Sequence, residues 1–137
     1  MFLKRRKEVK EVEYKEFDYH DFCIWLDEIL KKSLPKKAKG INFNLYEEDK
    51  PNIYGIQLVA TKDFDAEDDD WACDEIFSSG ENMFYFKNEN NWETVQKNME
   101  KTVKTYLEEG DFASTLKEFK GIALGFVDGD LSIVYKN

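Results

Sequence analysis

Carboxylates dominate one short stretch of the chain, DFDAEDDDWACDE at residues 63–75. Eight of its thirteen residues are Asp or Glu, which can bind cations, act as general acids or bases, or face a basic partner. Like charges at this density repel one another, and the repulsion opposes folding unless something offsets it. A cluster of this kind therefore indicates a function, such as binding a ligand, catalysing a reaction or contacting a partner.

Calcium is the first chemistry to weigh, because Asp63, Asp65 and Glu67 match the alternating ligand positions of an EF-hand loop. The sixth position is then Asp68, where such a loop requires glycine, and the twelfth is Asp74 instead of a bidentate glutamate. The flanking segments are a predicted strand and an unclear element, not two helices. The spacing favours weak cation binding over a specific site, and we expect no metal ligand.

Catalysis by these carboxylates is disfavoured by their crowding. A glycosidase or metal-assisted site places a few acids in a dry, shaped pocket with perturbed pKa values. Six carboxylates within residues 65–74, mostly consecutive, are typical of a solvated loop instead. We predict no catalytic residue and no cofactor.

Other nucleophile and phosphate-binding patterns also fail. His20 is the only histidine, and it lies inside a predicted helix, three residues before Cys23, without the partners that a metal site or a nucleophile system needs. The glycines of residues 121–129 lack the spacing and the lysine of a phosphate loop. We expect His20 to be a helix-surface residue.

Two interpretations of the acidic stretch remain. In the first it is an exposed loop that aids solubility. In the second it is a docking surface for a basic protein, with Trp71 as an aromatic anchor inside a charged rim and Phe64 close by. Trp71, Cys73 and Ile76 could instead tuck the segment against the core, and both interpretations can hold at once. The candidate partner-binding residues are Asp65, Glu67, Asp68, Asp69, Asp70, Trp71, Asp74 and Glu75.

The charge balance also favours a basic partner. The chain has 137 residues and a formal net charge of −9. Residues 1–40 carry eleven Lys and Arg against eight Asp and Glu, whereas residues 41–137 carry nine against twenty-one and stand at −12. This balance argues against nucleic acid as the partner, because phosphate binding needs concentrated Lys and Arg.

Length and composition predict one globular domain spanning residues 1–137, with 42% hydrophobic and 15% aromatic residues to build a core. The two cysteines lie fifty residues apart, which indicates reduced thiols and not a disulfide framework. No apolar run reaches the roughly 18 residues of a membrane span, and the first residues lack the apolar core of a signal peptide. We therefore expect a cytoplasmic protein; its oligomeric state is not predicted.

The first half of the chain predicts one helix and three strands. Asp18 can cap a helix that Pro35 ends, with Tyr19, Phe22, Cys23, Leu26, Ile29 and Leu30 forming one apolar stripe. Residues 41–48 alternate as a half-buried strand, and residues 53–61 predict a second strand that pairs with it in an antiparallel hairpin. Residues 83–87 predict a third strand, whereas residues 76–80 are ambiguous. Residues 1–16 are either a frayed helix start or a short edge strand and could be loosely attached.

The second half predicts two helices and a hairpin. Asn90 and Asn91 stand where a cap belongs, and Trp92, Val95, Met99, Val103, Tyr106 and Leu107 form an inward stripe that Gly110 closes. Asp111 can cap a shorter helix that ends at Gly121 and has Phe112, Leu116 and Phe119 on its inward face. The pair Asp128 and Gly129 between alternating segments predicts a hairpin. The fold class is therefore α+β, a mainly antiparallel sheet of about five strands with helices packed on one face.

The stretches WACDEIF at residues 71–77 and FVDGDL at residues 126–131, within the layout of residues 18–135, resemble a class of bacterial proteins. The class is the small acidic immunity proteins of polymorphic and contact-dependent toxin systems. The resemblance implies a non-catalytic protein that binds a cognate basic toxin, frequently a nuclease, and blocks its active site. It assigns no role to an individual residue.

An alternative from another class is a small enzyme or regulatory ligand-binding domain. Its pocket would lie between the sheet and the second and third predicted helices, lined by Tyr106, Tyr135 and Trp92, although packing in the core explains these three residues better. A toxin gene immediately upstream, or co-purification with a basic protein, would favour the binding-protein hypothesis over the enzyme hypothesis.

Overall fold

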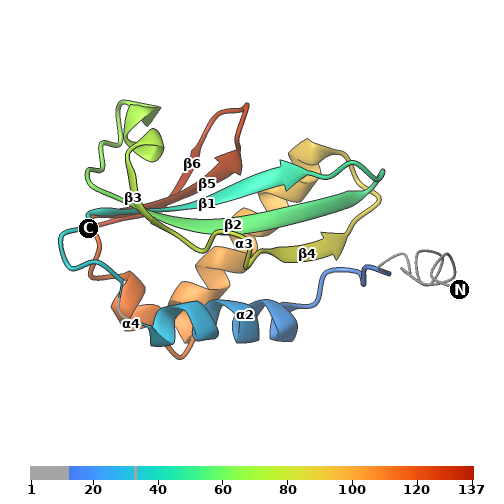
Figure 1. Cartoon of the computed structure of the whole chain (residues 1–137), viewed down its shortest axis with the longest axis horizontal. Helices are drawn as coiled ribbons and strands as arrows, with labels where there is room; N and C mark the ends of the chain where they lie inside the picture. The colour runs from blue at the N-terminus through green and yellow to red at the C-terminus, as the bar shows by residue number, and fades with distance from the viewer. Residues whose placement is uncertain (1–12, 33) are drawn as a thin grey trace, which may run out of the picture.

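The structure, a computed structural model, describes residues 13–32 and 34–137 of the chain. A six-stranded, mostly antiparallel sheet carries its helices on one face (Figure 1). The strand order is β3-β2-β1-β5-β6, and β4 also pairs with β2. The predicted α+β class is therefore confirmed, with a short strand added to those that the sequence predicts.

The centre of the sheet is β1 (Gly40–Glu47), which pairs with β2 (Ile53–Thr61) in the predicted antiparallel hairpin. On its other side β1 pairs in parallel with β5 (Gly121–Phe126). The prediction that residues 41–48 form a half-buried strand is wrong, because most residues of β1 are buried, as are those of β2. Both strands lie inside the sheet, with helices on one face and loops on parts of the other.

Shorter strands complete the sheet. The ambiguous segment forms β3 (Glu75–Ser78), which pairs with the end of β2, whereas the predicted third strand is β4 (Phe84–Lys87), which pairs with its beginning. The predicted hairpin of β5 and β6 (Ser132–Lys136) is confirmed. Its turn is closed by the N–H of Gly129, which donates to the carbonyl of Phe126 at 2.9 Å.

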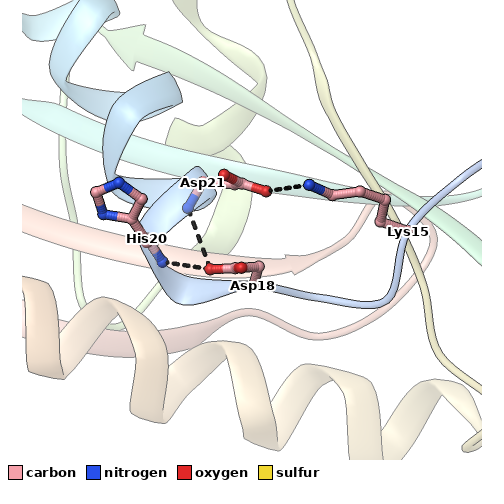
Figure 2. A network of polar contacts seen from close by, with 4 residues as sticks. All are labelled: Lys15, Asp18, His20 and Asp21. Carbon is pink, nitrogen blue, oxygen red and sulfur yellow. Dashed lines mark hydrogen bonds and ion pairs between the residues drawn. The ribbon is translucent and has the colours of Figure 1, made fainter.

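The predicted cap begins α2 (Tyr19–Lys31). The Asp18 carboxylate accepts hydrogen bonds from the N–H groups of His20 and Asp21, at 2.8 and 3.4 Å (Figure 2). Lys15 forms an ion pair with Asp21 at 2.9 Å, and this pair raises the pKa of the lysine. The His20 side chain is exposed, as predicted.

Most of residues 1–16 lie outside the described residues. Residues 13–16 run beside β4, where the N–H of Lys87 donates to the carbonyl of Lys15 at 2.8 Å and Glu16 forms a parallel bridge to Lys87. The Tyr14 and Tyr85 rings lie 5.6 Å apart. The described end of this segment thus lies along the sheet.

The second helix is α3 (Trp92–Glu109), and the Asn91 side chain caps it by accepting from the N–H of Thr94 at 3.0 Å. The prediction for the next helix is wrong in two respects. The helix α4 (Ala113–Leu116) is a single turn, and Phe112 precedes it without a side-chain cap. The predicted Asp111 cap is therefore absent from this helix start.

The core lies between the helix stripes and one face of the sheet. Its largest fully buried side chains include Phe22, Phe43, Phe86 and Tyr106. The Tyr106 hydroxyl donates to the Asp27 carboxylate and accepts from the N–H of Phe112. Burial is the main cause that raises the pKa of Tyr106 far above its usual value. One hydroxyl therefore joins α2, α3 and the turn that follows α3.

Replacing Tyr106 by Phe should lower the free energy of unfolding by about 1–3 kcal/mol, because Asp27 and the Phe112 N–H both lose a partner. Tyr135→Phe is the matched control, since that hydroxyl donates to the Lys117 carbonyl at an exposed position. Its loss should cost less than about 1 kcal/mol. Urea denaturation compares the two variants, and equal losses would show that the Tyr106 hydroxyl contributes no more than a surface group.

Candidate functional site

Seven carboxylates, which we call the acidic surface, lie on the loop between β2 and β3 and on the first residue of β3. They are Asp65, Glu67, Asp68, Asp69, Asp70, Asp74 and Glu75. All seven side chains are exposed. The loop rises above the sheet, on the side opposite α2, where it appears as the light-green turn in Figure 1. Six of the predicted partner-binding carboxylates therefore lie on one solvated loop, and the seventh, Glu75, begins the strand that follows it.

Short local hydrogen bonds shape this loop. The Asp65 carboxylate accepts from the N–H of Glu67 at 2.9 Å. The Asp68 carboxylate caps the 3₁₀ turn η1 (Asp69–Cys73) by accepting from the N–H of Asp70 at 3.0 Å. Each capping carboxylate thus offsets some of the repulsion by satisfying backbone donors.

The ion pairs of Lys15 and Lys31 use carboxylates outside the acidic surface. Within residues 13–32 and 34–137, ion pairs join Lys15 to Asp21 and Lys31 to Glu28, and none involves the acidic surface. In the same part of the chain, no three His, Cys, Asp or Glu side chains gather in a way that could hold a metal ion. The field of seven carboxylates thus projects into solvent.

Two aromatic rings attach the loop to the sheet. The Phe64 and Trp71 rings pack together with centroids 4.9 Å apart. They lie on Gly121 of β5 and Gly40 of β1, which are register partners on adjacent strands. A Cβ atom at Gly121 would stand 2.1 Å from the Phe64 ring, and one at Gly40 would stand 2.7 Å from the Trp71 ring. The paired glycines therefore form the platform on which the rings rest.

Backbone contacts hold both ends of the loop. The hydroxyl of Thr61, which is fully buried, donates to the carbonyl of Asp63 at 2.8 Å. The N–H of Lys62 donates to the carbonyl of Asp74 at 3.1 Å, so the chain enters and leaves the loop at one point. The acidic surface is thus fixed at its base as well as through its rings.

The aromatic part of the predicted site needs correction. Trp71 is only 5% exposed, so the interpretation of this ring as a surface anchor is wrong, because the ring packs on Gly40. The alternative, that Trp71 and Ile76 tuck the segment inward, agrees with their burial and packing. Cys73 is exposed and does not pin the loop.

The predicted ligand pocket is also changed. Tyr106 is fully buried in the core, so it lines no pocket, and the Tyr135 hydroxyl is bonded to the Lys117 carbonyl. Trp92 was expected to face the core, but it is 44% exposed because it begins α3 at the end of the sheet. It borders a cleft that the sequence alone did not reveal.

Comparison with protein-family models, with curated proteins and with solved structures gives no match to this chain. Among the described residues, no helix combines the length and the apolar character needed to cross a lipid bilayer. The acidic surface and its platform are therefore the observations on which a function can rest.

Replacing Gly121 by Ala should lower the free energy of unfolding by about 1–3 kcal/mol, because the new methyl group drives the Phe64 ring off the sheet. The gain from restricting the unfolded chain, about 0.4–1 kcal/mol, is smaller than this cost. Gly129→Ala is the matched control, since a Cβ there meets its nearest atoms at 3.7 and 3.9 Å. Urea denaturation measures both variants, and equal stability of the two would refute the platform.

Proposed function

We propose that this protein is a cytoplasmic, non-catalytic binding protein that neutralises a basic bacterial toxin through its acidic surface. The observation that carries the proposal is the set of seven exposed carboxylates on an anchored loop, without a described ion pair. Such a field steers a basic partner and can raise the association rate by about 10- to 1,000-fold at low salt.

Exposure of the carboxylates favours binding over catalysis. Acid–base chemistry uses carboxylates in dry pockets, where burial and neighbouring charges set their pKa values. The acidic surface stands in water instead, where its charges act at long range on an approaching protein. Attachment at both ends and through two rings supports the same function, because an ordered loop loses less conformational entropy on binding.

A nuclease is the class of toxin that we favour. The active site of a nuclease holds the phosphates of its substrate with Lys and Arg side chains. A row of carboxylates can form ion pairs with the same side chains. The resemblance of residues 71–77 and 126–131 to immunity proteins implies the same kind of partner. The first of these stretches leads from the 3₁₀ turn into β3, and thus carries part of the acidic surface.

The test uses, in an inactive form, the basic protein that co-purifies with this chain or that a toxin gene immediately upstream encodes, where either is found. Replacing Asp68, Asp69 and Asp70 by Asn should slow association by at least about tenfold at low salt and flatten its salt dependence. Asparagine still caps a helix start, so the turn is kept. Stopped-flow measurements over a range of salt concentrations give both quantities.

A matched control changes the net charge equally at exposed positions elsewhere: Glu108→Gln, Asp111→Asn and Glu118→Gln together. We expect its association rate to stay within about twofold of the wild type, because local charge and not net charge steers the encounter. If the Asn variant kept both its rate and its salt slope, the acidic surface would not be the docking face. Neutralisation by far less than one equivalent of protein would point to an enzyme instead.

A further inference from the structure

A second surface lies at the opposite end of β1. A cleft of about 270 Å³ opens where β1 and β5 end beside the first turn of α3. Its apolar wall includes Trp92, Phe126 and Val127, and its rim includes Glu47 and Asp128. Counted along β1, this cleft lies about 23 Å from the acidic surface. The two surfaces are therefore separate.

The apolar wall of the cleft is unusually open to solvent. Trp92 is 44% exposed and Val127 is 52% exposed, whereas Trp25 and Trp71 are 8% and 5% exposed. Neighbouring apolar side chains that are exposed in one cleft mark an interaction site, because their exposure to water is unfavourable in free energy. Tryptophan is also among the residues that contribute most to protein interfaces.

The walls of the cleft are held in place before any partner arrives. The Trp92 ring meets Phe126 edge-on with centroids 5.9 Å apart, and Phe126 meets Tyr54 in the same way at 5.9 Å. The N–H of Val127 donates to the carbonyl of Leu45 at 3.2 Å. Because these contacts preorganise the cleft, a partner loses little free energy in ordering it.

Side chains of α3 that follow Trp92 are hydrogen-bonded to the hairpin of β5 and β6. The buried Gln96 amide donates to the carbonyl of Asp130 at 3.2 Å and to the hydroxyl of Ser132 at 3.0 Å. The Ser132 hydroxyl donates to the Glu100 carboxylate at 2.6 Å. The hairpin that carries Val127 is thus tied to the helix that carries Trp92.

Negative charge surrounds the exposed ring. Beyond Trp92 lies a second hollow of about 210 Å³, lined by Glu93, Glu100 and Asp130 together with Lys97. Counted over both hollows, five carboxylates and one lysine line the space around the ring. An anionic ligand would be repelled here, whereas a cation gains from the carboxylates and from the face of the indole.

We propose that this cleft docks a protein segment in which an apolar side chain stands between Arg or Lys residues. The apolar side chain fills the cleft against Trp92 and Val127, and the flanking cations meet Asp128 on one side and Asp130 on the other. The proposal goes beyond the function of the acidic surface and does not rest on it. The buried apolar contact should govern the affinity of the segment more than its rate of association.

The test uses capped, fluorescein-labelled peptides and the full-length protein. Binding of a peptide with the repeat Arg-Leu-Arg is compared by fluorescence anisotropy with that of the Arg-Ser-Arg and Glu-Leu-Glu versions. We expect Arg-Leu-Arg to bind at least about tenfold more tightly than either, since it alone offers both apolar and cationic groups. Equal binding of the Arg-Ser-Arg version would overturn the proposal.

Variants locate the site. Trp92→Ala should weaken Arg-Leu-Arg binding by about tenfold or more. Val127→Ser, at an exposed position, should weaken it several-fold even if Trp92→Ala unfolds the protein. Asp68, Asp69 and Asp70 replaced by Asn should leave the preference for Leu over Ser intact. If that variant lost the preference and Val127→Ser kept it, the peptide would bind at the acidic surface.

Two other occupants are distinguished by the peptide assay and by sedimentation. Residues 2–12 include Phe2 and Leu3 next to four cationic residues, Lys4, Arg5, Arg6 and Lys7. If deleting residues 2–12 raised the peptide affinity by about tenfold, the chain's own segment would be the occupant. If sedimentation showed a dimer that Val127→Ser dissolves, a second copy would be the occupant. Either result would overturn the proposal of a separate partner.

Discussion

The contact of Phe64 and Trp71 with Gly121 and Gly40 is the interaction on which the acidic surface depends. Fully burying a large apolar side chain contributes about 1.5–3 kcal/mol, so the buried Trp71 ring and the half-buried Phe64 ring together contribute a few kcal/mol. Pairwise effects between exposed charges are typically below about 1 kcal/mol and are screened by salt. The rings can therefore hold a loop whose carboxylates repel one another. They do so only because glycine occupies both platform positions, on strands that run parallel and in register.

Strand β1 connects the two surfaces. Its first residue, Gly40, lies under the ring of Trp71, and its last residues border the cleft beside Trp92. The helices cover the other face of the sheet (Figure 1). There, the hydrogen bond from Tyr106 to Asp27 joins α2 to α3. A rigid central strand thus presents long-range charge at one end and an exposed aromatic ring at the other. This division fits a binding protein that first attracts a basic partner and then holds it.

Local signals in the sequence predicted most of the fold. Asp18 and Asn91 cap their helices and the Asp128–Gly129 turn forms its hairpin, because each depends on neighbours a few residues away. Two tryptophans needed more than local signals: of the two interpretations of Trp71, only inward packing agrees with the structure, and Trp92 is exposed and does not lie in the core. Trp71 is buried by glycines that lie far away in sequence, and Trp92 has helical spacing but begins its helix at the edge of the core. The presence of glycine at positions 40 and 121 does not show that the two residues are neighbours. The parallel pairing of β1 and β5 brings them together.

The central claim is that a fixed platform displays the acidic surface, and the indole N–H groups of the three tryptophans test it most directly. Their exchange with water can be measured by NMR in the wild-type protein, with Trp→Phe variants for assignment. We predict slow exchange for Trp25, whose N–H donates to the carbonyl of Asn82, and for the buried Trp71, against fast exchange for Trp92. Exchange of the Trp71 N–H as fast as that of Trp92 would show that the ring leaves its glycine, and would contradict the account.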